Sequence, residues 1–356
     1  MTDLETSIRP PASDPLIHGQ LPRQAPVLAA VIALGCGALT TVIGGFSLIA
    51  AVIIAWLLLL VGLPTWSRFV EGSRKAVDRF ATLMMWSAFA LAMVPLVSLV
   101  WTVTSKGIGI LSGQFLTYSM RGVLGEGGGI YHAVLGTLII TGLATVISVP
   151  IGVLAAVYLV EYGKGSKVAR VITFLVDVMT GIPSIVAGLF AYALFVLIFG
   201  PGVRMGIGGS VALSVLMIPI VVRASEEMLK LVPDELREAS YALGVPKWRT
   251  ITKVVLPTAV AGIVTGVTLA VARVAGETAP LLIIAGLTTG VNLNPFSDRM
   301  ATLPVFIFYS ITEPGLYAEE MTDYAWGAAF VLVTLVMILN ILARVVGGFF
   351  APKTGR

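Results

Sequence analysis

Three ionisable residues lie inside long apolar stretches of the sequence: Asp177, Arg273 and Glu277. A charged side chain within a membrane span is costly, so such a residue is by default a candidate for a functional site. An arginine at such a position offers an oxyanion two parallel N–H donors, since the guanidinium plane matches the geometry of phosphate-like groups. We therefore predict that these three residues line a path for an anionic substrate, with Arg273 as the group that binds it.

Two interpretations remain open for Arg273 and Glu277. The residues are four positions apart near the end of one apolar stretch, which predicts that they share a helix face. They either form an internal salt bridge that only neutralises two buried charges, or Glu277 holds the guanidinium and keeps an anion from binding too tightly, because a path must also release its cargo. Asp177 follows Arg170 by seven residues, about 10 Å along a helix, so it can instead reach water or a partner near the interface.

The composition indicates a membrane protein. The 356 residues are 57% hydrophobic and only 12% charged, with a mean hydropathy of +0.97. The basic residues are dispersed among apolar stretches, which disfavours nucleic-acid binding. Cys36 is the only cysteine, so an internal disulfide is excluded. The sequence G-x-x-x-x-G-K-[ST] does not occur, so we expect this chain not to bind ATP itself and to hold no cofactor or metal.

The apolar stretches predict an all-α polytopic fold with about eight spans. Of the 23 lysines and arginines, 18 fall on one side of this topology and four on the other, and the excess marks the cytoplasm. We therefore predict a multi-pass protein of the inner or plasma membrane with both termini cytoplasmic. A shorter apolar stretch, 302–312, is expected to be a re-entrant or surface helix. The predicted spans lie near 25–43, 46–66, 80–104, 130–160, 171–199, 206–225, 254–276 and 325–346.

A charge-rich loop, residues 226–256, joins two of these spans on the predicted cytoplasmic side. Asp234 suits a helix N-cap, Gly244 suits the position just after a helix, and Pro246 suits the first turn of a second helix. The pattern predicts a helix, a glycine corner and a second helix. By periodicity alone, the first helix can equally lie on the lipid surface.

The same loop resembles the EAA loop of ABC importer permeases. Its residues match the spacing E-A-A, three residues, G, nine residues, I, one residue, L-P, with mild departures at Ser240 and Val254. The resemblance implies a coupling helix that docks on a cytoplasmic ATPase subunit. The coupling residues that it implies are Glu238, Ala239, Ser240, Gly244, Leu256 and Pro257.

Further motifs resemble the phosphate-specific permeases, in particular their PstA-type subunits. These motifs are GIPSIVAGL at 181–189, GETAPL at 276–281 and YAWGAAFVLV at 324–333. The resemblance implies a type I importer core of six transmembrane helices within residues 80–350, preceded by an added hairpin at 25–66 and a disordered cytoplasmic tail at 1–24. It also implies that this chain is a transport subunit and not an enzyme. The implied partners are a PstC-like second permease, a PstB-like ATPase dimer that binds ATP and magnesium, and a PstS-like phosphate-binding protein.

Two other functions remain open at this point. A permease for sulfate, molybdate or tungstate would use the same arginine chemistry, since a guanidinium does not by itself distinguish tetrahedral oxyanions. A proton-coupled secondary transporter would use Asp177 or Glu277 and is expected to contain an internal repeat of spans. No clear repeat is present in the sequence.

Overall fold

The computed structural model describes residues 19–123 and 125–350, in which all the regular secondary structure is helical. The predicted tail therefore lies outside the described residues as far as position 18. The described chain divides into two compact units, one ending at Val100 and the other starting at Trp101. Seven of the described helices are long and apolar enough to cross a membrane, or eight spans exist if one bent pair of helices counts as a span. The prediction of a polytopic all-α membrane protein is confirmed.

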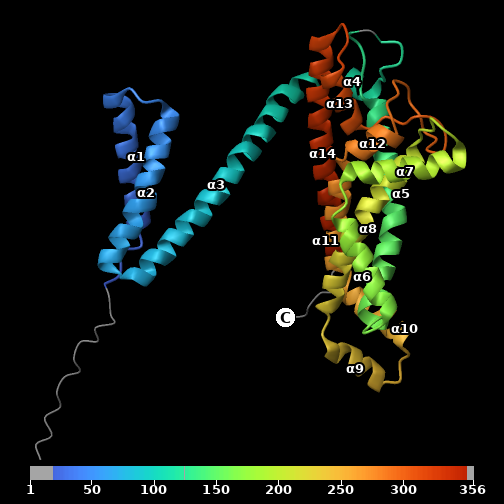
Figure 1. The fold of residues 1–356 in the computed structure, drawn as a ribbon, viewed down its shortest axis with the longest axis horizontal. Coiled ribbons are helices and arrows are strands. Elements are labelled where there is room, and N and C mark those ends of the chain that lie inside the picture. Colours follow the sequence, from blue (N-terminus) through green and yellow to red (C-terminus); the bar gives the residue numbers. More distant parts are fainter. Residues whose placement is uncertain (1–18, 124, 351–356) are drawn as a thin grey trace, which may run out of the picture. The chain divides into compact units, whose positions relative to one another are not determined.

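The first unit is a helical hairpin followed by most of a long helix (Figure 1). Gly45 ends the first helix in a left-handed conformation with φ of 64°, which glycine adopts readily after a helix. Gly37 allows the two hairpin helices to approach closely, because a Cβ there would lie 2.5 Å from the carbonyl oxygen of Ala51. The helices are α1 (Ala25–Gly44), α2 (Leu48–Val70) and α3 (Ser73–Gly107), whose last residues belong to the second unit.

The connection between α2 and α3 is held by a buried carboxylate. Glu71 accepts hydrogen bonds from Arg79 Nε at 2.7 Å, Ser67 Oγ at 2.7 Å and the backbone N–H of Leu21 at 3.0 Å. These donors hold the pKa of Glu71 at about 2, below its ordinary value of 4.5, with the Arg79 hydrogen bond as the main cause, although burial acts in the opposite direction. The carboxylate thus ties the segment before α1 to the start of α3.

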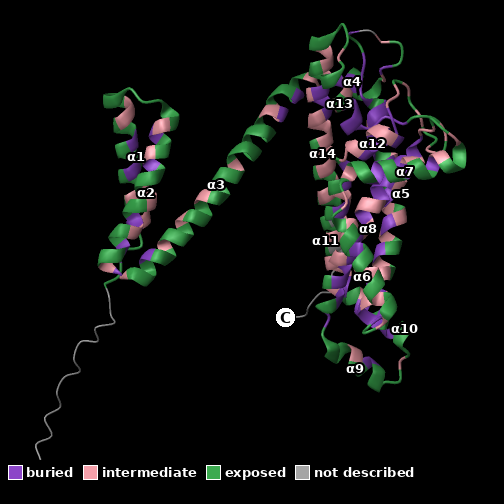
Figure 2. Ribbon diagram, viewed as in Figure 1, coloured by how far each residue is buried: buried purple, intermediate pink, exposed green. Residues whose placement is uncertain are grey.

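The second unit contains the remaining helices. It is organised around α5 and α8, which lie side by side at its centre (Figure 1). Figure 2 shows that buried residues concentrate along these two helices, whereas most of α3 is exposed. The helices of this unit are η1 (Ile108–Ile110), α4 (Gly113–Thr117), α5 (Tyr131–Val157), η2 (Tyr158–Tyr162), α6 (Lys167–Thr180), α7 (Ser184–Phe199), α8 (Gly206–Lys230), α9 (Asp234–Ala242), α10 (Lys247–Thr250), η3 (Ile251–Val255), α11 (Leu256–Ala275), α12 (Ala279–Ile284), α13 (Leu303–Thr312) and α14 (Ala318–Phe350).

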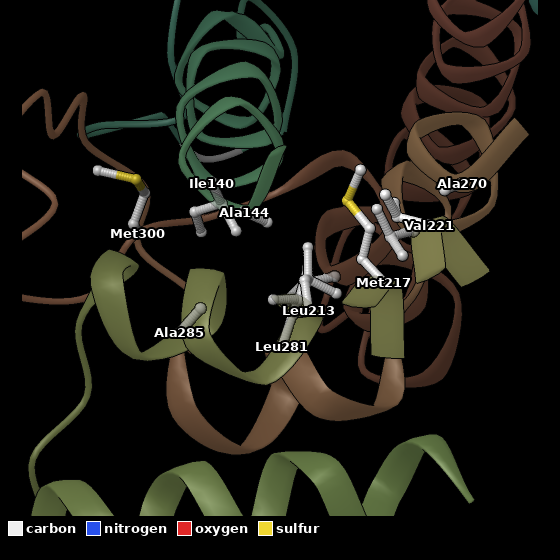
Figure 3. Packing of buried hydrophobic residues seen from close by; sticks show 11 residues of the cluster. Ile140, Ala144, Leu213, Met217, Val221, Ala270, Leu281, Ala285 and Met300 are labelled. Atoms are coloured by element: carbon white, nitrogen blue, oxygen red, sulfur yellow. The ribbon is translucent and has the colours of Figure 1, made fainter. Parts of the chain in front are cut away.

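Small residues and interhelical hydrogen bonds join α5 to α8. Ser210 Oγ donates to the carbonyl of Ile140 at 3.1 Å, and Ser214 Oγ donates to that of Ala144 at 3.4 Å. Such bonds contribute on average about 0.6 kcal/mol each in a membrane, where van der Waals packing rather than hydrophobic burial drives helix association. Figure 3 shows the resulting core, in which Ile140 and Ala144 lie close to Leu213.

Two glycines of α11 pack against α8. A Cβ on Gly262 would meet the side chain of Met228, and one on Gly266 would lie 2.4 Å from the Cβ of Ala224. This small-residue face of α11 therefore packs on a helix of the same chain.

The prediction that residues 171–199 form a single straight span is wrong. The segment forms α6 and α7, whose axes differ by 111°, and α7 lies across the bundle (Figure 1). The break falls at Gly181–Pro183, where proline removes a backbone donor and drives the preceding residue out of the helical region. The short apolar helix expected at 302–312 is present as α13, and its first half is buried.

Candidate functional site

The loop between α8 and α11 forms the predicted helix, corner and helix at one end of the second unit (Figure 1). Gly244 follows α9 with φ of 74°, which is the left-handed conformation expected after a helix. The N–H of Val245 donates to the carbonyl of Ser240 at 3.2 Å, and that of Gly244 donates to Tyr241 at 2.9 Å, so the last carbonyls of α9 are satisfied. Pro246 precedes the first residue of α10.

The start of α9 differs from the prediction. Pro233 occupies the N-cap position and Asp234 is the first helical residue, with no side-chain cap hydrogen bond. The Asp234 carboxylate instead accepts from Arg237 Nη1 at 3.1 Å. Asp234 and Glu235 still place negative charge in the first turn, where the helix dipole favours it.

An ion pair fixes α9 to the end of α5. The side chains of Arg237 and Glu161 are only 11% and 5% exposed. Arg237 donates to Glu161 Oε1 from Nη2 at 2.9 Å and from Nε at 3.1 Å, and it also donates to the carbonyls of Leu229 at 3.0 Å and Val232 at 2.6 Å. One guanidinium therefore joins α9, the end of α8 and the π-helical turn η2, which carries Glu161. The sequence motifs did not indicate this pair, because its members are separated by 76 positions.

Two more contacts join the second half of the loop to the bundle. Lys247 donates to the carbonyl of Glu161 and lies over the ring of Tyr162, 4.8 Å from its centroid. The hydroxyls of Ser240 and Thr250 lie 2.8 Å apart, and both side chains are buried. The serine that departs from the E-A-A pattern thus links α9 to α10.

The outward face of the loop carries exposed apolar and acidic side chains. Leu243 is 83% exposed and Trp248 is 58% exposed, and Leu236 and Tyr241 are exposed nearby. Glu238 is also exposed. Of the remaining residues predicted to couple, Ala239, Gly244 and Pro257 are exposed and Leu256 is half-buried at the start of α11. The loop is therefore anchored on one side and presents an uncovered, partly apolar surface on the other.

The structure does not join Arg273 to Glu277. The helix α11 ends at Ala275, so Glu277 lies beyond it, and the prediction of one shared helix face is wrong. The C-cap Gly276 ends the helix between the two residues. Among the described residues, no ion pair links them. Arg273 is exposed and Glu277 is half-buried in the connection to α12.

Asp177 lies in a separate cluster. Its carboxylate, which is 60% exposed, pairs with Arg223 of α8. Arg223 also donates to Glu226 at 2.8 Å, and Lys230 donates to the same carboxylate at 2.7 Å. This pairing near the end of α8 agrees with the interpretation that Asp177 reaches a partner near the membrane interface. By helical rise Arg273 lies about 24 Å along α11 from Pro257, so it is remote from the coupling end of the unit.

Comparison with known proteins covers most of the chain. It is 46% identical over 278 residues to the phosphate transport system permease protein PstA 1 of Mycobacterium tuberculosis, covering 77% of this chain and 89% of that protein. It is 39% identical over 284 residues to the PstA permease protein of Yersinia pestis, covering 79% and 92%. The inward-facing MetNI methionine ABC transporter aligns with a TM-score of 0.48 and 21% identity over 63% of this chain and 94% of that one.

A family model matches residues 148–356, which contain the whole coupling loop and both Arg273 and Glu277. Relatives of this kind are permease subunits of ABC transporters, that is, transport components without an enzymatic reaction of their own. The predictions of a transport subunit and of its family are confirmed. This chain belongs to the family of binding-protein-dependent transport system inner membrane components.

Proposed function

We propose that this chain is the transmembrane permease subunit of an ATP-driven importer for inorganic phosphate. The observation that carries the substrate assignment is the 46% identity, over most of both chains, to a protein named for phosphate transport. The exposed guanidinium of Arg273 on α11 is consistent with this substrate, since arginine suits a tetrahedral oxyanion. This chain performs no covalent chemistry.

The coupling loop transmits movement from an ATPase to the spans. The exposed face around Leu243 and Trp248 docks on the ATPase. Because Arg237 joins α9 to Glu161, a displacement of α9 is carried to α5 and α8. On the other side of Gly244, α10 and η3 run directly into α11, which carries Arg273. A displacement of the coupling loop is thereby transmitted to three spans, α5, α8 and α11.

The assembly needs partners that this chain does not contain. A PstC-like permease completes the path, a PstB-like ATPase dimer binds ATP and magnesium, and a PstS-like protein delivers phosphate. The coupling loop and both termini face the cytoplasm, in agreement with the excess of lysine and arginine on that side. Arg273 and Glu277 line the path, whereas Asp177 pairs with Arg223 nearer the coupling end.

Uptake of radiolabelled phosphate tests the proposal. Cells lacking this chain are compared with cells in which it is restored, with unlabelled arsenate or sulfate as competitors and with ATP depleted in a parallel arm. We expect ATP-dependent uptake that arsenate inhibits and sulfate does not. Competition by sulfate and not by arsenate would indicate another oxyanion as the substrate. Uptake that survives ATP depletion would indicate a secondary transporter.

A further inference from the structure

Three arginines of the second unit converge on one loop, residues 286–299, which follows α12 in the half of the unit away from α9 (Figure 1). A Cβ built on Gly286 would lie 3.2 Å from Cδ of Arg204 and 3.3 Å from Cδ of Arg299. A Cβ on Gly290 would lie 3.7 Å from Cδ of Arg121. The aliphatic parts of all three side chains therefore lie next to Gly286 or Gly290, at the start of the loop.

These guanidinium groups have no protein partner in the part of the chain that the structure describes. Among the described residues, no ion pair involves Arg121, Arg204 or Arg299, and none of their guanidinium groups donates a hydrogen bond to another residue. In the same unit, by contrast, Arg223 and Arg237 are each held by carboxylates. Three neighbouring positive charges repel one another, so an arrangement without acidic partners favours an anion from solution.

The loop lines an open cavity of about 720 Å³. Arg121 and Arg299 line it together with hydroxyl-bearing and amide side chains, and Asp298 contributes one negative charge. With Arg204 beside Gly286, the cavity and its edge carry three positive charges against one. The cavity holds hydrogen-bond donors and an excess of positive charge, which is the combination that recognises phosphate-like groups.

The frame of the cavity is fixed by backbone hydrogen bonds. The N–H of Met300 donates to the carbonyl of Ala285 at 3.1 Å, which closes the base of the loop, and the N–H of Ile207 donates to Pro295 at 2.7 Å. Asn292 Nδ2 donates to the carbonyls of Ser297 at 2.7 Å and Arg299 at 3.1 Å. Gly286 adopts φ of 71°, which a side chain disfavours, and so lets both arginine stems approach. These hydrogen bonds fix the conformation of the loop that lines the cavity.

We propose that this cavity binds a tetrahedral phosphoryl oxyanion through Arg121, Arg204 and Arg299. It is a second anion site, separate from Arg273 of α11, and it holds the anion at the entrance before the anion enters the path. Its role in uptake rests on the proposed function, whereas the binding itself does not. The phosphoryl group can come from free phosphate or from a phospholipid headgroup, and the experiment separates these two sources.

The test measures protection of arginines from phenylglyoxal, which modifies free guanidinium groups. The full-length chain is placed in phosphatidylcholine nanodiscs with inorganic phosphate or with potassium chloride at equal ionic strength, and adducts are located by mass spectrometry. We expect phosphate, and not chloride, to protect the three arginines. Arg204→Gln removes one charge-assisted hydrogen bond to the anion. We expect about tenfold more phosphate to be needed for the same protection of Arg121 and Arg299, which corresponds to about 1.4 kcal/mol.

Matched variants and a second lipid complete the design. Arg74→Gln removes an exposed arginine of the first unit and should leave the protection unchanged, whereas Arg204→Lys should retain part of it because the charge remains. Protection that appears only in nanodiscs containing phosphatidylglycerol assigns the site to a lipid phosphate. Equal protection by phosphate and chloride in both lipids, or protection that Arg204→Gln does not weaken, overturns the proposal. Protection without phosphate uptake by the complex would refute the proposed function alone.

Discussion

Arg237 and Glu161 form a buried ion pair, with Nη2 and Oε1 2.9 Å apart, that joins the first helix of the coupling loop to the end of α5. Both side chains are nearly inaccessible, and the guanidinium also satisfies the carbonyls of Leu229 and Val232. Removing one member of such a pair leaves an uncompensated buried charge, which typically costs about 3–5 kcal/mol. The pair is therefore a buried attachment of α9 to the end of α5.

We predict that Arg237→Gln uncouples the transporter. The loop would lose its attachment to α5, so ATP hydrolysis by the assembled complex would continue while phosphate uptake falls. The measurement is the ratio of phosphate transported to ATP hydrolysed in proteoliposomes. Arg74→Gln, a change at an exposed arginine, serves as the control. An unchanged ratio in Arg237→Gln would show that α9 transmits movement without this pair.

The corner at Gly244 provides a second prediction. Its φ of 74° suits glycine and is tolerated by asparagine, but it is strained for a β-branched residue. No atom lies within 4 Å of the position of a Cβ there, so the effect of substitution is conformational rather than steric. Gly244→Val should abolish uptake and ATPase co-purification, whereas Gly244→Asn should retain both. Equal loss in the two variants would mean that the backbone conformation is not the cause.

The exposed arginine of α11 provides a third prediction. Arg273→Ala should reduce phosphate uptake severely while the chain still assembles with its partners, because the side chain has no ion pair within the described chain that its loss would break. Arg273→Lys keeps the positive charge but loses the bidentate hydrogen-bond donor, so its phosphate uptake should be intermediate. Uptake rates and co-purification are measured together. Full uptake in Arg273→Ala would remove this residue from the path.

The buried carboxylate of the first unit gives a pH-dependent prediction. The pKa of Glu71 is lowered to about 2, chiefly by the hydrogen bond from Arg79. A lowered pKa in the folded state means that the ionised group stabilises the fold fully above the ordinary value of 4.5 and progressively less as the pH falls toward 2. The difference in melting temperature between the wild type and Glu71→Gln should thus be constant near neutral pH and shrink below 4.5. A difference that grows on acidification would contradict this assignment.

Much of the fold was predictable because apolar length and charge position are local properties of a sequence. The hairpin α1–α2, the turn at Gly45 and the helix, glycine and helix of the coupling loop all follow from such signals. The 111° break at Gly181–Pro183 was missed, although proline in that segment provided a signal. The stretch 171–199 contains only one charged residue, Asp177, so hydropathy alone does not separate a bent pair from one span.

Less of the candidate site than of the fold could be predicted from the sequence. Spacing placed Arg273 and Glu277 on one helix, but α11 ends between them at Ala275. The contact of Arg237 with Glu161 and the convergence of arginines on Gly286 join positions far apart in the chain. Such contacts depend on the packing of whole helices, which local patterns do not specify.

Reconstitution tests the proposed function most directly. The purified chain, a second permease and the ATPase are placed in proteoliposomes with the binding protein and labelled phosphate on one side and ATP with magnesium on the other. We expect phosphate to accumulate against its gradient only when ATP is present, and to stop accumulating when Arg237→Gln replaces the wild-type chain. Accumulation that proceeds without ATP, or no accumulation of phosphate while sulfate is transported, would contradict an ATP-driven phosphate importer.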